Sequence, residues 1–254
     1  MYKEVRPHQL LAEYIDAYWI SEVTQFSRQR ILPDTCADII FNISEETIAA
    51  GNGELISPNT AFVVGTMTTF RDSLLPAHTR MLGIRFRPGG LNAFTRLPLQ
   101  LITDGHLSLK EVALSWHSRL EPLLEKEKSL PAKINCMEKF LLQQLPVRNI
   151  SADKIKYSVA LIQQTHGGIP VATLAAQAFM SVRNFERCFL QAVGVSPKKF
   201  SRIVRFMEIK QQLKTSSHTH LLSLALDNGF YDHAHLTREF RLFSGDSPTI
   251  YLQR

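Results

Sequence analysis

The sequence has few of the features that mark disulfide-bonded, secreted or membrane-spanning proteins. Its three cysteines, Cys36, Cys136 and Cys188, lie far apart and form no Cys-x-x-Cys pair, so neither a disulfide framework nor a zinc knuckle is indicated. No run of about 18 apolar residues could cross a bilayer, and charges interrupt the first residues too early for a signal peptide. We therefore expect buried free thiols in a soluble, cytoplasmic protein that does not enter a membrane.

The usual sequence marks of catalysis are also missing. The chain contains no Gly-x-Ser-x-Gly elbow, no glycine-rich phosphate loop and no His-Glu-x-x-His helix, which would indicate a hydrolase, a nucleotide site or a zinc protease. We expect a protein that is not an enzyme, with no catalytic residue and no cofactor.

The charge is divided unevenly along the chain. Lys and Arg number 29 against 23 Asp and Glu, a net charge of +6. Residues 150–254 hold 13 basic and 7 acidic residues, and subtraction from the totals leaves 16 of each for residues 1–149. A neutral front and a basic back suit a regulator whose rear domain meets a polyanion, although many soluble proteins carry such a surplus without binding nucleic acid.

Residues 1 to about 95 have the pattern of a β-rich domain. Three strand-length apolar runs, 37–43, 60–67 and 80–88, are separated by prolines and by a hairpin-type loop at 50–54. In the third run, alternation predicts one apolar face that comprises Met81, Gly83/Ile84 and Phe86.

From residue 107 the periodicity favours helices. Ser108 and Glu111 form a Ser-x-x-Glu capping box at the start of a helix over 108–126. A second helix over 131–145 has an apolar stripe made by Ile134, Met137, Phe140/Leu141 and Leu145. Residues 146–154 resemble a hinge, and we expect Ser151 to cap the following helix. The prediction is an α+β protein: a β-rich regulatory or dimerisation domain with C-terminal helices in residues 1–149, then an all-α domain in residues 150–254.

The all-α part contains a weak internal repeat. The two copies span residues 171–197 and 221–248, and each has an apolar helix with a small residue at its centre, a short turn, and a capping Ser181 or Asp232 that opens another helix. With these caps aligned, the matching pairs are Phe185 and Leu236, Arg187 and Arg238, Phe189 and Phe240, and Gly194 and Gly245. This is the pattern of a helix-turn-helix unit repeated twice.

The stretch "GFYDHAHLTREF" (229–240) allows a metal site, an acid-base site or a helix that contacts DNA. His233 and His235 lie two residues apart, about 200° around a helix, so they cannot hold one ion together. Asp232 is better used as an N-cap. His218 and His220 lie in the preceding loop, and they keep a metal-responsive DNA-binding protein as an alternative.

The interpretation as a DNA-binding protein depends on the faces of the two capped helices that do not pack into the core. In the first copy the outward positions hold Arg183, Glu186 and Arg187, and in the second they hold His233, Ala234, Thr237 and Arg238. The first turns of a recognition helix reach base edges in the major groove. A single such face would be an ordinary solvated surface, but two capped copies in one register in the basic half favour DNA.

Residues 171–251 resemble the DNA-binding domain of the AraC/XylS family of bacterial transcription regulators, through "LAAQAFMS", "NFERCFLQAVGVSPKKF", "RIVRFMEIKQQL" and "GFYDHAHLTREFRLFSGDSP". The resemblance implies helix-turn-helix units at about 171–192 and about 221–243, joined by a bridging helix at about 198–214, whose recognition helices enter successive major-groove segments. It assigns base contacts to Arg183, Glu186, Arg187, His233, Ala234, Thr237 and Arg238. It assigns phosphate contacts to Ser181, Lys198, Lys199 and Arg241.

Three positions depart from the family pattern. Phe179 stands where the first turn usually has glycine, and if that position needs a positive φ a bulky residue costs about 1 kcal/mol there. Ile209 replaces a common alanine in the bridging helix, which predicts altered packing between the subdomains. Ala234 offers no hydrogen bond to a base.

The front half resembles an uncharacterised β-rich domain found ahead of this DNA-binding unit, through "ILPDTCADIIFNI" and "MLGIRFRPGGLNAF". It implies a sensing or dimerising module with no known ligand; Arg85, Arg87 and the Gly89-Gly90 amides could form an anion nest. We expect a sequence-specific transcription regulator that binds double-stranded DNA, forms a homodimer, and has a small-molecule effector and RNA polymerase as further candidate partners. The alternative from another class is a thiol-dependent DNA-repair adaptor with Cys36 as nucleophile.

Overall fold

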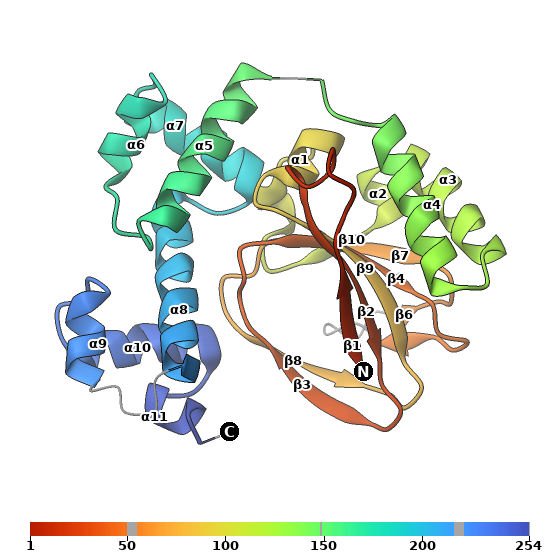
Figure 1. The fold of residues 1–254 in the computed structure, drawn as a ribbon, viewed down its shortest axis with the longest axis horizontal. Helices are drawn as coiled ribbons and strands as arrows, with labels where there is room; N and C mark the ends of the chain where they lie inside the picture. The colour runs from red at the N-terminus through yellow and green to blue at the C-terminus, as the bar shows by residue number, and fades with distance from the viewer. Residues whose placement is uncertain (50–54, 148, 216–220, 254) are drawn as a thin grey trace.

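The computed structural model describes residues 1–49, 55–147, 149–215 and 221–253. Figure 1 shows a β-rich part covered by helices and, beside it, a purely helical part that ends at the C-terminus. The chain therefore has the expected α+β fold. The hairpin-type loop 50–54 lies outside the described residues.

A six-stranded antiparallel sheet organises the first part. Its spatial order is β1 (Tyr2–Val5), β2 (Ile15–Glu22), β9 (Arg80–Phe86), β4 (Ala37–Asn42), β7 (Ala61–Val64) and β10 (His106–Ser108). Two small ribbons pair β3 (Ser27–Ile31) with β8 (Arg71–Leu75), and β5 (Ile48–Ala49) with β6 (Leu55–Ile56). The three apolar runs of the sequence become β4, β7 and β9, which are neighbours in the sheet.

The two faces of β9 differ from the predicted pattern. Leu82, Ile84 and Phe86 are fully buried in the core, so the period of two places Met81 and Gly83 on the opposite face. The expected grouping of Met81 and Gly83 with Phe86 is wrong. Gly83 is needed there because Trp19 of β2 lies against it: a Cβ at Gly83 would be 2.1 Å from the indole Cε2.

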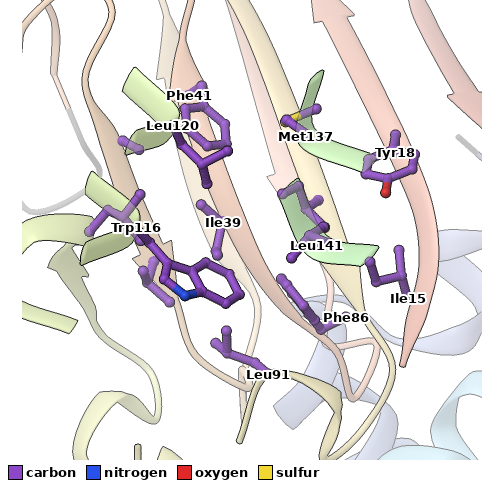
Figure 2. Close-up of a cluster of buried hydrophobic side chains, with 14 of the residues drawn as sticks. Ile15, Tyr18, Ile39, Phe41, Phe86, Leu91, Trp116, Leu120, Met137 and Leu141 are labelled. Carbon is purple, nitrogen blue, oxygen red and sulfur yellow. The ribbon is translucent and has the colours of Figure 1, made fainter. Parts of the chain in front are cut away.

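Helices cover one face of the sheet. They are α1 (Gly90–Thr95), the 3-10 helix η1 (Leu99–Ile102), α2 (Leu109–Val112), α3 (Leu114–Lys126) and α4 (Leu130–Gln143). Figure 2 shows Trp116 and Leu120 of α3 and Met137 and Leu141 of α4 packed toward strand residues such as Phe41. This burial fixes the helices on the sheet.

Three details of the predicted helices change. The Ser108–Glu111 capping box is present, but the expected helix over 108–126 breaks at Ala113, whose φ of −154° and ψ of 83° are not helical. Leu145 lies beyond the end of α4 and is 38% exposed, so it does not continue the buried stripe. Asn149, not Ser151, caps the next helix, since its side chain accepts hydrogen bonds from the amides of residues 151 and 152.

The C-terminal part is built from seven helices in the described residues. They are α5 (Ile150–Gln164), α6 (Val171–Gln177), α7 (Val182–Val193), α8 (Pro197–Thr215), α9 (Leu221–Asp227), α10 (His233–Ser244) and α11 (Pro248–Tyr251). They enclose two separate cores, one around Phe185 and Phe189 and the other around Phe206 and Phe240. The long helix α8 contributes to both and connects them (Figure 1). Across the described segments, no helix is long and apolar enough to span a bilayer.

Candidate nucleic-acid interface

The two copies of the repeat have the same local construction. In the first, the Ser181 hydroxyl caps α7 by accepting from the Asn184 amide at 3.3 Å. In the second, the Asp232 carboxylate caps α10 by accepting from the His235 amide at 2.6 Å. Each helix buries its apolar face and ends at a glycine with a left-handed backbone, Gly194 or Gly245. Each copy is therefore a pair of helices with a defined start and end for the second helix.

The turns before the two second helices differ by one residue. α6 and α9 are 50 positions apart, whereas the caps Ser181 and Asp232 are 51 apart. Phe179 and Gly229 are equivalent, because both follow their first helix by two residues and have positive φ values, 54° and 72°. The positive φ considered for Phe179 from the sequence is therefore present. The additional residue of the second turn is Tyr231.

Most of the side chains predicted to contact bases are exposed. These are Arg183, Glu186, Arg187, His233, Ala234 and Arg238. The guanidinium of Arg187 donates to the side-chain oxygen of Asn184 at 2.8 Å, which holds it along α7. Thr237 differs, since it is only half-exposed and its hydroxyl is buried without a hydrogen-bond partner among the described residues.

The side chains predicted to contact phosphates lie in two situations. Ser181, Lys198 and Arg241 are exposed. Lys199 is half-buried, with its ammonium 5.2 Å from the centre of the Phe243 ring. Burial and the neighbouring Arg202 lower the pKa of Lys199.

The bridging helix α8 fixes the second unit through charge-assisted contacts. The Arg202 guanidinium forms two hydrogen bonds to the Glu239 carboxylate of α10, at 2.7 and 2.6 Å. Arg205 donates to the carbonyl of Gly229 in the second turn at 3.4 Å. Ile209 is 1% exposed and belongs to the second core, so its larger side chain is accommodated by packing.

The β-rich part holds the C-terminal end of α7. The buried Thr66 hydroxyl donates to the carbonyl of Val193 at 2.7 Å, and the Thr103 hydroxyl donates to the carbonyl of Gly194 at 2.5 Å. Gly194 packs so closely that a Cβ there would be 3.2 Å from the carbonyl oxygen of Leu99 in η1. These contacts satisfy helix carbonyls that have no partner within α7.

A second set of contacts holds the same position of α10. The Arg30 guanidinium of β3 donates to the carbonyl of Ser244 at 3.2 Å and pairs with Asp246 at 3.0 Å. The Thr69 hydroxyl donates to the carbonyl of Leu242 at 2.9 Å. Both second helices therefore point their C-terminal ends at the β-rich part and their N-terminal ends away from it, as Figure 1 shows. No motif or periodicity in the sequence indicates these contacts.

The structure also bears on the two alternatives to a DNA-binding regulator, a nucleophilic Cys36 thiol and a metal site. Burial, together with Asp34 and Asp38, raises the pKa of the Cys36 thiol, which opposes formation of a nucleophilic thiolate. All three cysteines are free and only partly buried. The described residues contain no group of side chains that could hold a metal, and His218 and His220 lie outside them.

The groups that could have formed an anion nest contact other groups of the protein. Arg85 lies 3.3 Å from Glu4 and 3.5 Å from Asp38, and Arg87 pairs with Asp16 at 2.9 Å. The Gly90 amide donates to the carbonyl of Arg87 at 2.7 Å. Acidic side chains of the same chain thus lie against both arginines.

Comparison with known families divides the chain in two. Residues 3–108 match a domain of unknown function, DUF6597, and residues 174–254 match a helix-turn-helix domain family. An uncharacterized HTH-type transcriptional regulator of Haemophilus influenzae (strain ATCC 51907 / DSM 11121 / KW20 / Rd) is 34% identical over 93 residues, which are 37% of this chain. The match spans about a third of that relative's length, 31%.

Comparison with solved structures gives matches with TM-scores below 0.5. ToxT from Vibrio cholerae is 12% identical over 92% of this chain and 95% of its own, with a TM-score of 0.45. An AraC-type DNA-binding domain-containing regulator from Chromobacterium violaceum is 23% identical over 41% of this chain and 92% of its own, with a TM-score of 0.38. The DNA-binding domain of AdpA, solved with a target DNA, is 28% identical over 42% and 92%, with a TM-score of 0.36.

The family match, the paired helices and their caps lie in the same stretch of chain. Behind an amino-terminal stretch that matches a domain of unknown function, residues 174–254 thus form a helix-turn-helix domain.

Proposed function

We propose that this protein is a transcription regulator that binds specific sequences of double-stranded DNA through α7 and α10. The observation that carries the proposal is that two capped helices are presented in the same way. Their N-terminal turns are exposed and point away from the β-rich part, while their C-terminal ends are anchored to it. A recognition helix contacts base edges with its N-terminal residues, so this orientation leaves the required ends free.

The side chains on those ends suit both base and phosphate contacts. Arg187 and Arg238 occupy equivalent, exposed positions and can each form two hydrogen bonds with a guanine. Arg183, Glu186, His233 and Ala234 surround them, while the half-buried Thr237 contributes through its methyl group. Ser181, Lys198, Lys199 and Arg241 are the phosphate contacts of this proposal.

The predicted DNA site follows from two unequal helices in one chain. Because α7 and α10 carry different side chains, the site is asymmetric. Its two contacted segments lie about 34 Å apart, one turn of the duplex.

The proposal includes control of DNA binding by the N-terminal part. A change in the β-rich part, caused by an effector or by self-association, would reach both recognition helices, because Thr66, Thr103 and Arg30 hold their ends directly. A homodimer and contact with RNA polymerase stay predictions.

Selection of bound duplexes from a random pool by the full chain tests the DNA-binding proposal. We expect enrichment of an asymmetric site, and Arg187→Ala or Arg238→Ala should weaken binding by about 1–3 kcal/mol and relax preference at one base position each. Arg6→Ala, which removes an exposed arginine of the β-rich part, is the control of equal charge. Failure to enrich any sequence would contradict the proposal, and uniform weakening across base variants would reassign the two arginines to phosphates.

A further inference from the structure

Two aromatic side chains are exposed at the turns that precede the recognition helices. Phe179 and Tyr231 are each 87% exposed, more than any other large apolar side chain in the described segments. Phe179 lies two residues before the cap of α7, and Tyr231 lies directly before the cap of α10. Large aromatic side chains are usually buried, so two such residues at corresponding turns require an explanation.

The backbone at Phe179 does not favour phenylalanine. Its φ of 54° lies in the left-handed region, which a bulky side chain rarely adopts. The equivalent residue of the second turn is Gly229, which adopts this conformation freely. Packing within the protein does not explain Phe179 either, because the only ring contact described for it is the Lys154 ammonium, 5.7 Å from the ring centre. Residues kept in such strained positions often serve function.

The second turn also exposes an aromatic ring, but at a different position in the turn. The Phe230 amide donates to the carbonyl of Ala225 at 2.9 Å, just as the Met180 amide donates to Ala175 at 2.9 Å. Phe230 is 6% exposed and fills the buried place in this turn. Tyr231 is therefore the additional residue, and it places an aromatic ring outside. Two turns of different length and sequence each present one exposed ring beside a recognition helix.

We propose that Phe179 and Tyr231 contact DNA and that their rings cover apolar surface beside the bases that α7 and α10 contact. The inference rests on the proposed DNA-binding function. The apolar surface available there is the thymine methyl group in the major groove or the C–H edge of deoxyribose at its rim. Apolar contacts of this kind add affinity without removing counterions, because neither ring carries a charge.

Phe179→Gly separates DNA contact from folding, because glycine suits the positive φ. In the full chain, we expect the midpoint of thermal unfolding to rise by about 2 °C. Affinity for the selected duplex should fall about tenfold, as for loss of about half the burial of one ring, with an unchanged slope against salt. Tyr231→Ala should also weaken binding about tenfold, whereas Tyr231→Phe should bind like the wild type.

Replacing thymine by uracil in the selected duplex distinguishes the two apolar surfaces. Loss of affinity for the uracil duplex in the wild type, but not in Phe179→Gly, identifies a methyl contact; equal affinity identifies deoxyribose. Phe26→Ala is the matched control, since Phe26 is 68% exposed in the β-rich part, and it should leave binding unchanged. Binding of Phe179→Gly and Tyr231→Ala within about twofold of a wild type that binds its duplex would overturn this inference alone. A wild type without DNA affinity would overturn the DNA-binding function with it.

Discussion

At the scale of single residues, Asp38 is a carboxyl group whose pKa the fold raises. It projects from β4 beneath Trp19, whose indole nitrogen donates to the carboxylate at 2.6 Å. Burial raises the pKa of Asp38 to about 7, although the neighbouring Arg85 and the hydrogen bond from Trp19 lower it. The sequence could not indicate this, because Trp19, Asp38 and Arg85 come from three strands that only the sheet brings together.

The raised pKa of Asp38 predicts a pH-dependent stability. The carboxyl holds its proton more tightly in the folded chain than in the unfolded one, where its pKa is 3.8. The free energy of unfolding should therefore decrease between about pH 4 and pH 7, by at most about 4 kcal/mol. Asp38→Asn cannot ionise, so urea unfolding across this range should show it gaining stability relative to the wild type as pH rises. Parallel curves for the two proteins would contradict the assignment.

Single residues whose role depends on their neighbours in sequence were predicted well. The capping box of Ser108 and Glu111 is present because both members lie within one helical turn. The conflict between a bulky Phe179 and a positive φ is likewise a property of a short turn. Burial of the Thr237 hydroxyl was not foreseen, because it depends on how α10 packs and not on its position along the helix.

At the scale of elements, the helices of the repeat are specified by local signals. Caps, buried faces and terminal glycines occur at the expected positions of α7 and α10. The break at Ala113 was not predicted, since it arises where α2 packs against β7 and β10 and the chain then turns into α3. Local chemistry thus sets where a helix begins, and contact with distant strands sets where it is interrupted.

The cap of α10 gives a prediction at this scale. Asp232→Ala removes the acceptor for the His235 amide and should destabilise the folded chain by about 1 kcal/mol, whereas Asp232→Asn should retain most of the stability. Urea unfolding measures the loss, and hydrogen exchange should localise it to the first turn of α10. If Ala and Asn have equal effects, the carboxylate is not acting as a cap.

At the scale of the whole molecule, the contacts that relate the two parts join residues very distant in sequence. Thr66 and Val193 are 127 positions apart, and Arg30 and Asp246 are 216 apart. No periodicity or motif reports on such pairs. Their arrangement nevertheless follows the repeat, because Val193-Gly194 and Ser244-Gly245 are equivalent positions and each is held by a different segment of the β-rich part.

The salt bridge at Arg30 allows the coupling between the parts to be tested with a matched pair of variants. Arg28 and Arg30 both bind Asp72, but only Arg30 of the two has a described contact with the end of α10, through Ser244 and through Asp246 just beyond the helix. Arg30→Ala should therefore release the last turn of α10, and its amides should exchange about tenfold faster, as for loss of one charge-assisted hydrogen bond. Arg28→Ala should leave this exchange unchanged. Equal exchange in both variants would show that the Arg30 contacts do not hold the last turn of α10, and would leave the hydrogen bond from Thr69 to Leu242 as the described contact by which the β-rich part reaches this helix.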